Sequence, residues 1–187
     1  MMSLDNTYSQ EEVRDFVVRV QKLLPGEPLE WLVEPKADGV AISLRFEDGL
    51  FTRGTTRGDG IAGDDVTANL RTIRTIPLQL SALGPADVPG VLEVRGEVIM
   101  TRSGFAQLNR ERAAAGVPLF ANPRNATAGS LKQLDSALVA KRPLDIVLYG
   151  SGEIGGGPAI DSQSALLDAL GQLGFRTPQH TWCCSCV

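Results

Sequence analysis

A short polar segment at residues 34–39 has the sequence EPKADG and places the amine of Lys36 between two carboxylates. A lysine amine becomes a nucleophile when it loses its proton, and partial burial or nearby cations favour that loss. Gly39 would let the backbone turn close to a ligand. The same pattern also fits an exposed lysine in a salt bridge, with Asp38 as a turn former beside the glycine. Alone, the segment predicts either a nucleophile or an ordinary surface charge.

Further polar blocks follow the lysine along the chain. They are TRGDG at 56–60, GDDVT at 63–67, NLRTI at 69–73, EVRGEV at 93–98, FANPRNA at 120–126 and GSLKQLD at 129–135. In isolation, the block at 56–60 predicts a tight polar turn, and Arg124 predicts a surface charge. In motif identity, order and spacing together, the chain from Ser3 to about Tyr149 resembles the adenylation domain of bacterial NAD-dependent DNA ligases.

The resemblance implies that Lys36 attacks the α-phosphate of NAD, expels nicotinamide mononucleotide and becomes a lysyl-AMP phosphoramidate. It makes Lys36, Asp38 and Arg57 the expected catalytic residues. Glu34 resembles the residue that recognises the adenine edge, where a carboxylate accepts from an exocyclic amine. Arg57 resembles an arginine near the AMP ribose and phosphate, where its fixed fork of donors suits anionic oxygen. Glu97 resembles the carboxylate that accepts from the ribose 2′-hydroxyl.

The resemblance also covers residues near the start of the chain, beside Lys36 and beyond Glu97. Ser3 and Leu4 match a short segment that lines the nucleotide pocket. Asp38 is expected either to partner the lysine or a metal, or to shape the turn. Arg124 belongs, in the family, to the face that meets AMP and nicked DNA. Lys132 stands where the family usually has arginine, so contact with phosphate or DNA there should be weaker because the bidentate fork is lost.

The elements that must position these residues follow from the pattern of apolar positions. Ser9 and Glu12 form a capping box that opens a helix reaching residue 24. Alternation from Val40 to Phe46, a turn and a returning run at 50–56 predict a hairpin. The remaining pattern predicts strands at 91–100 and 144–149, helices at 103–116, 126–134 and 162–173, and a glycine-rich connector at 150–157.

This order predicts an α+β fold. The resemblance implies an ATP-grasp-like nucleotidyltransferase core of antiparallel sheets flanked by helices, incomplete because we expect the chain to be cut short at both ends relative to the family. We expect one partial adenylation domain over 1–187, with an irregular tail at 175–187. The cysteines Cys183, Cys184 and Cys186 lie in that tail. With His180 they could supply four zinc ligands, although adjacent ligands close a tetrahedron poorly, and a ragged tail fits better.

Composition limits the remaining choices. A chain with 43% apolar and 21% charged residues is typical of a globular protein. The start of the chain lacks the pattern of a secretory signal, so we expect a cytoplasmic protein, not associated with membranes. The net charge of −4 argues against a protein that holds nucleic acid by charge alone. A locally basic segment at 105–142 allows local contact or forms a solvated face.

We therefore expect a monomer that uses NAD and Mg²⁺, carries AMP and meets nicked double-stranded DNA as part of the full-length enzyme. No residue is assigned as a metal ligand. The leading hypothesis is the adenylation core of an NAD-dependent DNA ligase, with the 187 residues alone weakly active or inactive. The alternatives are an inactive nucleotide-binding remnant and an ATP-dependent ligase or capping-type nucleotidyltransferase, which shares the K-x-D-G pattern.

Overall fold

The structure, a computed structural model, describes residues 6–80, 88–157 and 160–184. It divides into two compact units, one made of residues 1–35 and 179–187 and the other of residues 36–178. The sequence predicted a single domain. The division arises because the chain enters the first unit again near its end, where a late strand pairs with an early one.

The first unit contains helix α1 (Gln10–Leu23), strand β1 (Trp31–Val33) and strand β6 (Trp182–Cys184). Helix α1 confirms the predicted helix: the Ser9 side chain accepts from the backbone N–H of Glu12 at 3.2 Å. On its predicted apolar face, Val17 is buried while Val13 and Phe16 remain exposed. The ring of Phe16 packs edge-on against Trp31, with centroids 5.8 Å apart.

Within the tail predicted at 175–187, the described residues include one short strand at 182–184. Strand β6 pairs antiparallel with β1, with Leu32 opposite Cys183. Phe175, also in the predicted tail, is buried in the second unit against Phe46. No periodic pattern of apolar residues marks these segments, because each of them is short. Backbone pairing therefore holds residues 182–184, and burial of its ring holds Phe175, in a segment with no periodic pattern in sequence.

The second unit is built on a four-stranded antiparallel sheet in the order β3-β2-β4-β5. Strands β2 (Val40–Glu47) and β3 (Leu50–Thr56) confirm the predicted hairpin, joined at Asp48-Gly49, a dipeptide favoured in two-residue turns. Strand β4 (Val91–Met100) confirms the next prediction. Strand β5 (Leu144–Gly155) is longer than predicted, because β4 continues to pair with the glycine-rich residues, for which the sequence predicts a connector.

The two faces of this sheet differ in character. One face is apolar and packs against α6 and the segment 66–80, with a core that includes Ile42, Leu44, Phe46, Val94, Val98, Ile146, Leu148, Leu166 and Leu170. The residues that alternate with these on β2 and β4 form what we call the polar face: Ala41, Ser43, Arg45, Glu93, Arg95 and Glu97. Alternation along each strand creates both faces from one sequence.

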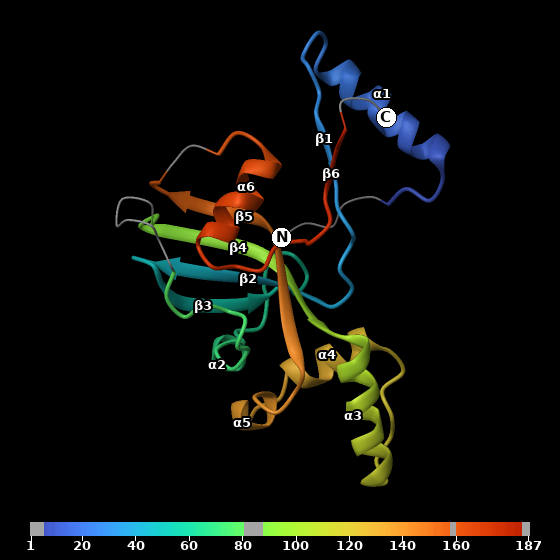
Figure 1. Ribbon diagram of the computed structural model, residues 1–187, viewed down its shortest axis with the longest axis vertical. Coiled ribbons are helices and arrows are strands. Elements are labelled where there is room, and N and C mark those ends of the chain that lie inside the picture. The colour runs from blue at the N-terminus through green and yellow to red at the C-terminus, as the bar shows by residue number, and fades with distance from the viewer. Residues whose placement is uncertain (1–5, 81–87, 158–159, 185–187) are drawn as a thin grey trace. The chain divides into compact units, whose positions relative to one another are not determined.

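Helices complete the second unit. Helix α6 (Gln163–Gln172) contacts β5, and the short α2 (Thr67–Leu70) contacts β3. Helices α3 (Arg102–Ala114), α4 (Pro123–Leu131) and α5 (Ser136–Val139) gather at one end of β4 and β5 (Figure 1). The structure confirms the helices predicted at 103–116 and 162–173.

Helix α4 begins earlier than the sequence predicted. The side chain of Asn122 caps it by accepting from the N–H of Asn125 at 2.8 Å, and Pro123 occupies the first turn. Proline is tolerated there because the N–H that it lacks would have no helical partner. The predicted start at residue 126 missed this cap.

The architecture is α+β with antiparallel sheets and helices, as the sequence predicted. None of the helices in the described part of the chain has the length and apolar character that a membrane span requires.

Candidate functional site

Lys36 opens the second unit, in the loop that leads into β2, and its side chain is exposed. Asp38 in the same loop accepts from the guanidinium of Arg124 across 3.1 Å. Both side chains of this ion pair are more than half exposed, so it contributes at most about 1 kcal/mol of stability. The pair nevertheless brings the first turn of α4 beside the lysine loop, so two predicted site residues 86 positions apart meet.

Glu97 lies on the polar face of the sheet, directly opposite Ala41 of the neighbouring strand. On the other side of Ala41, the backbone N–H of Arg57 donates to the Ala41 carbonyl at 3.0 Å. Residues in one row across an antiparallel sheet project to the same side. Glu97 and Arg57 therefore flank Ala41 in a single row, with the carboxylate on one side and the arginine on the other.

The Glu97 side chain is only 6% exposed, which is unusual for a carboxylate. The hydroxyl of Tyr149, from β5, donates to its Oε2 at 3.2 Å. A buried carboxylate needs donors, and Tyr149 supplies one of them. Sequence reasoning placed Tyr149 only at the limit of the family match. The signal for Tyr149 that the sequence offers is a polar aromatic residue at the end of an apolar strand, just before Gly150.

The loop at 57–64 follows β3 and forms the tight polar turn that its block predicts. Its ends are tied to the sheet, since Thr56 N–H donates to the Asp64 carbonyl at 3.0 Å. The ammonium of Lys132 lies 2.7 Å from the Asp64 carboxylate, so the residue after α4 meets this loop. Sequence reasoning did not foresee Asp64 as the partner of Lys132.

A buried amide fixes the segment that carries Lys132. Asn69 donates through its side-chain nitrogen to the carbonyls of Leu131 and Gln133, at 2.7 and 2.8 Å. These bonds join α2 to the end of α4. Asn69 falls in the block at 69–73, so a structural role explains part of that motif.

Asp59 gives the loop a predicted dependence on pH. The N–H groups of Ala62 and Ile61 donate to its Oδ1 at 2.8 and 2.9 Å and hold the pKa of Asp59 below its usual value. A carboxylate with a lowered folded-state pKa contributes stability above its unfolded pKa, and that contribution is lost as the pH falls through the folded pKa. We expect the loop to stay intact at neutral pH and to loosen only in acid.

Amide chemical shifts of Ile61 and Ala62, followed by NMR during an acid titration, measure this effect. The midpoint should lie below the ordinary aspartate value of about 3.9. Asp59→Asn is the matched control, because its side chain keeps an acceptor but does not titrate, and its shifts should stay flat over the same range. A wild-type midpoint at or above the ordinary value would contradict the expectation.

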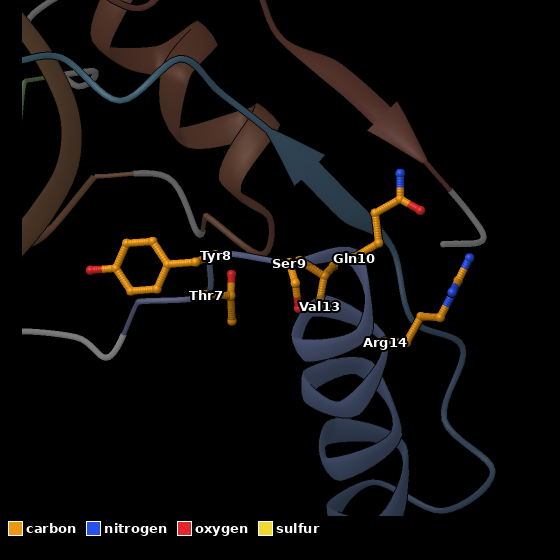
Figure 2. Close-up of a pocket in the computed structure, with 6 residues that line it drawn as sticks. All are labelled: Thr7, Tyr8, Ser9, Gln10, Val13 and Arg14. Atoms are coloured by element: carbon orange, nitrogen blue, oxygen red, sulfur yellow. The ribbon is translucent and has the colours of Figure 1, made fainter.

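The other predicted residues fall in the first unit. Glu34 directly follows β1 and is partly buried. Ser3 and Leu4 lie outside the described residues. A surface pocket of about 450 Å³ lies at the start of α1, lined by Thr7, Tyr8, Ser9, Gln10, Val13 and Arg14 (Figure 2). Since it includes none of the predicted site residues, we assign it no role.

No group of three or more His, Cys, Asp or Glu side chains in the described part of the chain is arranged to hold a metal ion. Cys183 is exposed and Cys184 is partly buried in β6, and both are free thiols. Cys186 lies outside the described residues. Residues 6–80, 88–157 and 160–184 therefore offer no such cluster for Mg²⁺, and we derive no step through that ion.

Comparison with known proteins identifies the family. Residues 1–187 match the family described as "NAD-dependent DNA ligase adenylation domain". The chain belongs to this family, and both units lie within the matched domain.

Two similar relatives are named DNA ligase. One, from Desulforapulum autotrophicum, is 52% identical over 179 residues, which is 94% of this chain and 26% of the relative. The other, from Methylacidiphilum infernorum, is 50% identical over 185 residues, covering 99% of this chain and 26% of the relative. The chain thus spans about a quarter of the length of the curated relatives that it matches.

Proposed function

We propose that this chain is the adenylation core of an NAD-dependent DNA ligase and that Lys36 is the residue that carries AMP. The observation that carries the proposal is the contact between the lysine loop and Glu97. A β-carbon added at Gly39 would lie 3.1 Å from the Cγ methylene of Glu97, so the end of this loop lies beside the stem of that buried side chain. Lys36, the proposed ribose acceptor Glu97 and Arg57 then belong to one site.

The proposed reaction begins when the neutral amine of Lys36 attacks the α-phosphorus of NAD. A nitrogen–phosphorus bond forms, and the bond from that phosphorus to the bridging oxygen breaks. Nicotinamide mononucleotide leaves with the electron pair, and the ammonium proton is lost to solvent. An oxygen of the 5′-phosphate at a nick then attacks the phosphorus of AMP, and the nitrogen–phosphorus bond breaks and returns the amine of Lys36. The 3′-hydroxyl finally attacks the activated 5′-phosphate, and AMP leaves with the electron pair of the bond that breaks.

NAD is consumed in this scheme and is therefore a substrate. The residues suit its adenosine half: Glu97 accepts from the ribose 2′-hydroxyl, and Arg57 stabilises phosphate charge as a fixed fork of donors. Glu34 is proposed to accept from the adenine amine. When bound, Mg²⁺ would supply neutralisation of phosphate charge, and it would be held through the phosphates and water, because the described residues offer no cluster of three or more ligating side chains.

The remaining assignments are part of the same proposal. Asp38 positions Arg124, and Arg124 and Lys132 contact phosphate or nicked DNA. Arg124 pairs with Asp38, and Lys132 pairs with Asp64. An incoming phosphate could displace each cation from its carboxylate. We further propose an ATP-grasp-like core, a cytoplasmic monomer, and DNA binding through a protein of the relatives' length.

Mass spectrometry of the 187-residue chain tests the function. The chain is incubated with NAD, with ATP or with neither. We expect one AMP to be added slowly, and only with NAD. Positioning of the leaving group can lower the activation barrier by roughly 7 to 11 kcal/mol, and this positioning depends on more of the protein than a single pocket. An adduct formed only from ATP would instead support an ATP-dependent nucleotidyltransferase. No adduct with either nucleotide would favour an inactive nucleotide-binding remnant.

A further inference from the structure

Strand β5 contains a bulge at Tyr149. Gly96 of β4 pairs with Leu148 and the preceding Arg95 pairs with Gly150, so Tyr149 is one extra residue between two consecutive pairs. A bulge breaks the regular alternation of side chains, bends the strand and redirects the side chain that it carries. The direction of the Tyr149 ring is therefore set by the register of the two strands.

Gly96 is the residue that permits this close approach. A β-carbon at this position would lie 2.2 Å from the carbonyl oxygen of Val147 and 2.5 Å from Cδ2 of Leu148. Both distances are shorter than atomic contact allows, so any larger residue would push β5 away. The sequence Arg95-Gly96-Glu97 thus places a required glycine beside the buried carboxylate.

The redirected hydroxyl meets Glu97. Tyr149 Oη donates to Glu97 Oε2 at 3.2 Å, and the carbonyl of Tyr149 accepts from the side-chain nitrogen of Gln163 at 2.7 Å. Gln163 is the first residue of α6, so the helix fixes the backbone of the bulge. A donor on Oε2 restricts rotation of the carboxylate. Oε1 is then the oxygen that accepts a hydrogen bond from another donor.

We propose that Tyr149 is a positioning residue that orients Glu97 toward a ribose hydroxyl and thereby makes the site select ribonucleotides over 2′-deoxyribonucleotides. The inference rests on the proposed function, because it uses Glu97 as the ribose acceptor. Tyr149 acts through Glu97, since its hydroxyl donates to the carboxylate. A site built to bond a hydroxyl discriminates against a ligand that lacks it, because a buried acceptor is then left unpaired.

The test is isothermal titration of AMP and of 2′-deoxy-AMP into wild type, Tyr149→Phe, Glu97→Ala and the double variant. We expect wild type to favour AMP by about tenfold to a hundredfold, the range for a hydrogen bond to a charged group. Glu97→Ala should bring the ratio near one. Tyr149→Phe, which keeps the ring and the bulge, should lower the ratio at least threefold, and the double variant should match Glu97→Ala alone.

The ratio of the two affinities separates positioning from general destabilisation of the protein, because destabilisation weakens the binding of both ligands alike. Tyr8→Phe removes the other tyrosine hydroxyl, on an exposed residue, and should leave the ratio at its wild-type value. A wild-type ratio in Tyr149→Phe, with loss of the ratio in Glu97→Ala, would overturn the inference and leave the proposed function standing. If wild type binds neither nucleotide, or binds both equally, the assignment of Glu97 fails and the inference fails with it.

Discussion

Lys36→Ala should eliminate any covalent AMP adduct that the chain forms with NAD, because the variant has no amine in the nucleophile position. Lys36→Arg should do the same, although it keeps the positive charge. A guanidinium stays protonated at every accessible pH, so it offers no lone pair for attack on phosphorus. The loss should be complete within the detection limit of intact-protein mass spectrometry, and the fold should be unaffected because the side chain is exposed.

Lys22→Ala is the matched control for this experiment. Lys22 is also exposed, in the last turn of α1, and it has no place in the proposed site. Its variant should form the adduct at the wild-type rate. An adduct that persists in either Lys36 variant would place the nucleophile elsewhere, and peptide mapping of the modified chain would identify it.

Sequence periodicity predicted the elements whose apolar residues face a single core. Strand β2 alternates because only one of its faces is buried, and β3 pairs with it apart from one irregularity at Arg45 and Phe46. Helix α6 matches the helix predicted at 162–173 and buries its leucines. The extension of β5 could not be predicted in this way. Glycines at 150, 152 and 155 look like a connector, yet backbone pairing with β4 holds them in a strand.

For the candidate site, the sequence proposes a set of residues but no contacts between them. The resemblance to the family identifies Lys36, Arg57 and Glu97 as candidate site residues, but it gives no distance between them. The pair Asp38–Arg124 joins residues 86 positions apart, and no local pattern encodes such a contact. Tyr149 was overlooked for a similar reason: its role depends on a bulge, and the register of two strands determines where a bulge falls.

Gly39→Ala should be the most disruptive small substitution near the site. A β-carbon there would lie 1.9 Å from the carbonyl oxygen of Val98 and 2.9 Å from its carbonyl carbon. These are backbone atoms of a central strand, so they cannot rotate away as a flexible side chain could. Overpacking costs typically 1 to 3 kcal/mol, and this case should reach about 3 kcal/mol. For a domain of this size, the unfolding midpoint should fall by roughly 6 to 12 °C.

The added methyl group should also disturb the site, because it would press on Cγ of Glu97 at 3.1 Å and displace the loop that carries Lys36. Thermal unfolding followed by circular dichroism measures the first effect, and AMP transfer from NAD below the melting range measures the second. Gly171→Ala is the control, since a β-carbon in that part of α6 meets nothing within 4 Å. Its midpoint should stay level or rise, because alanine favours a helix by roughly 0.5 to 1 kcal/mol over glycine. An unchanged midpoint and normal AMP transfer in Gly39→Ala would mean that the loop has room to shift, and close packing on β4 would then not be what holds Lys36 in place.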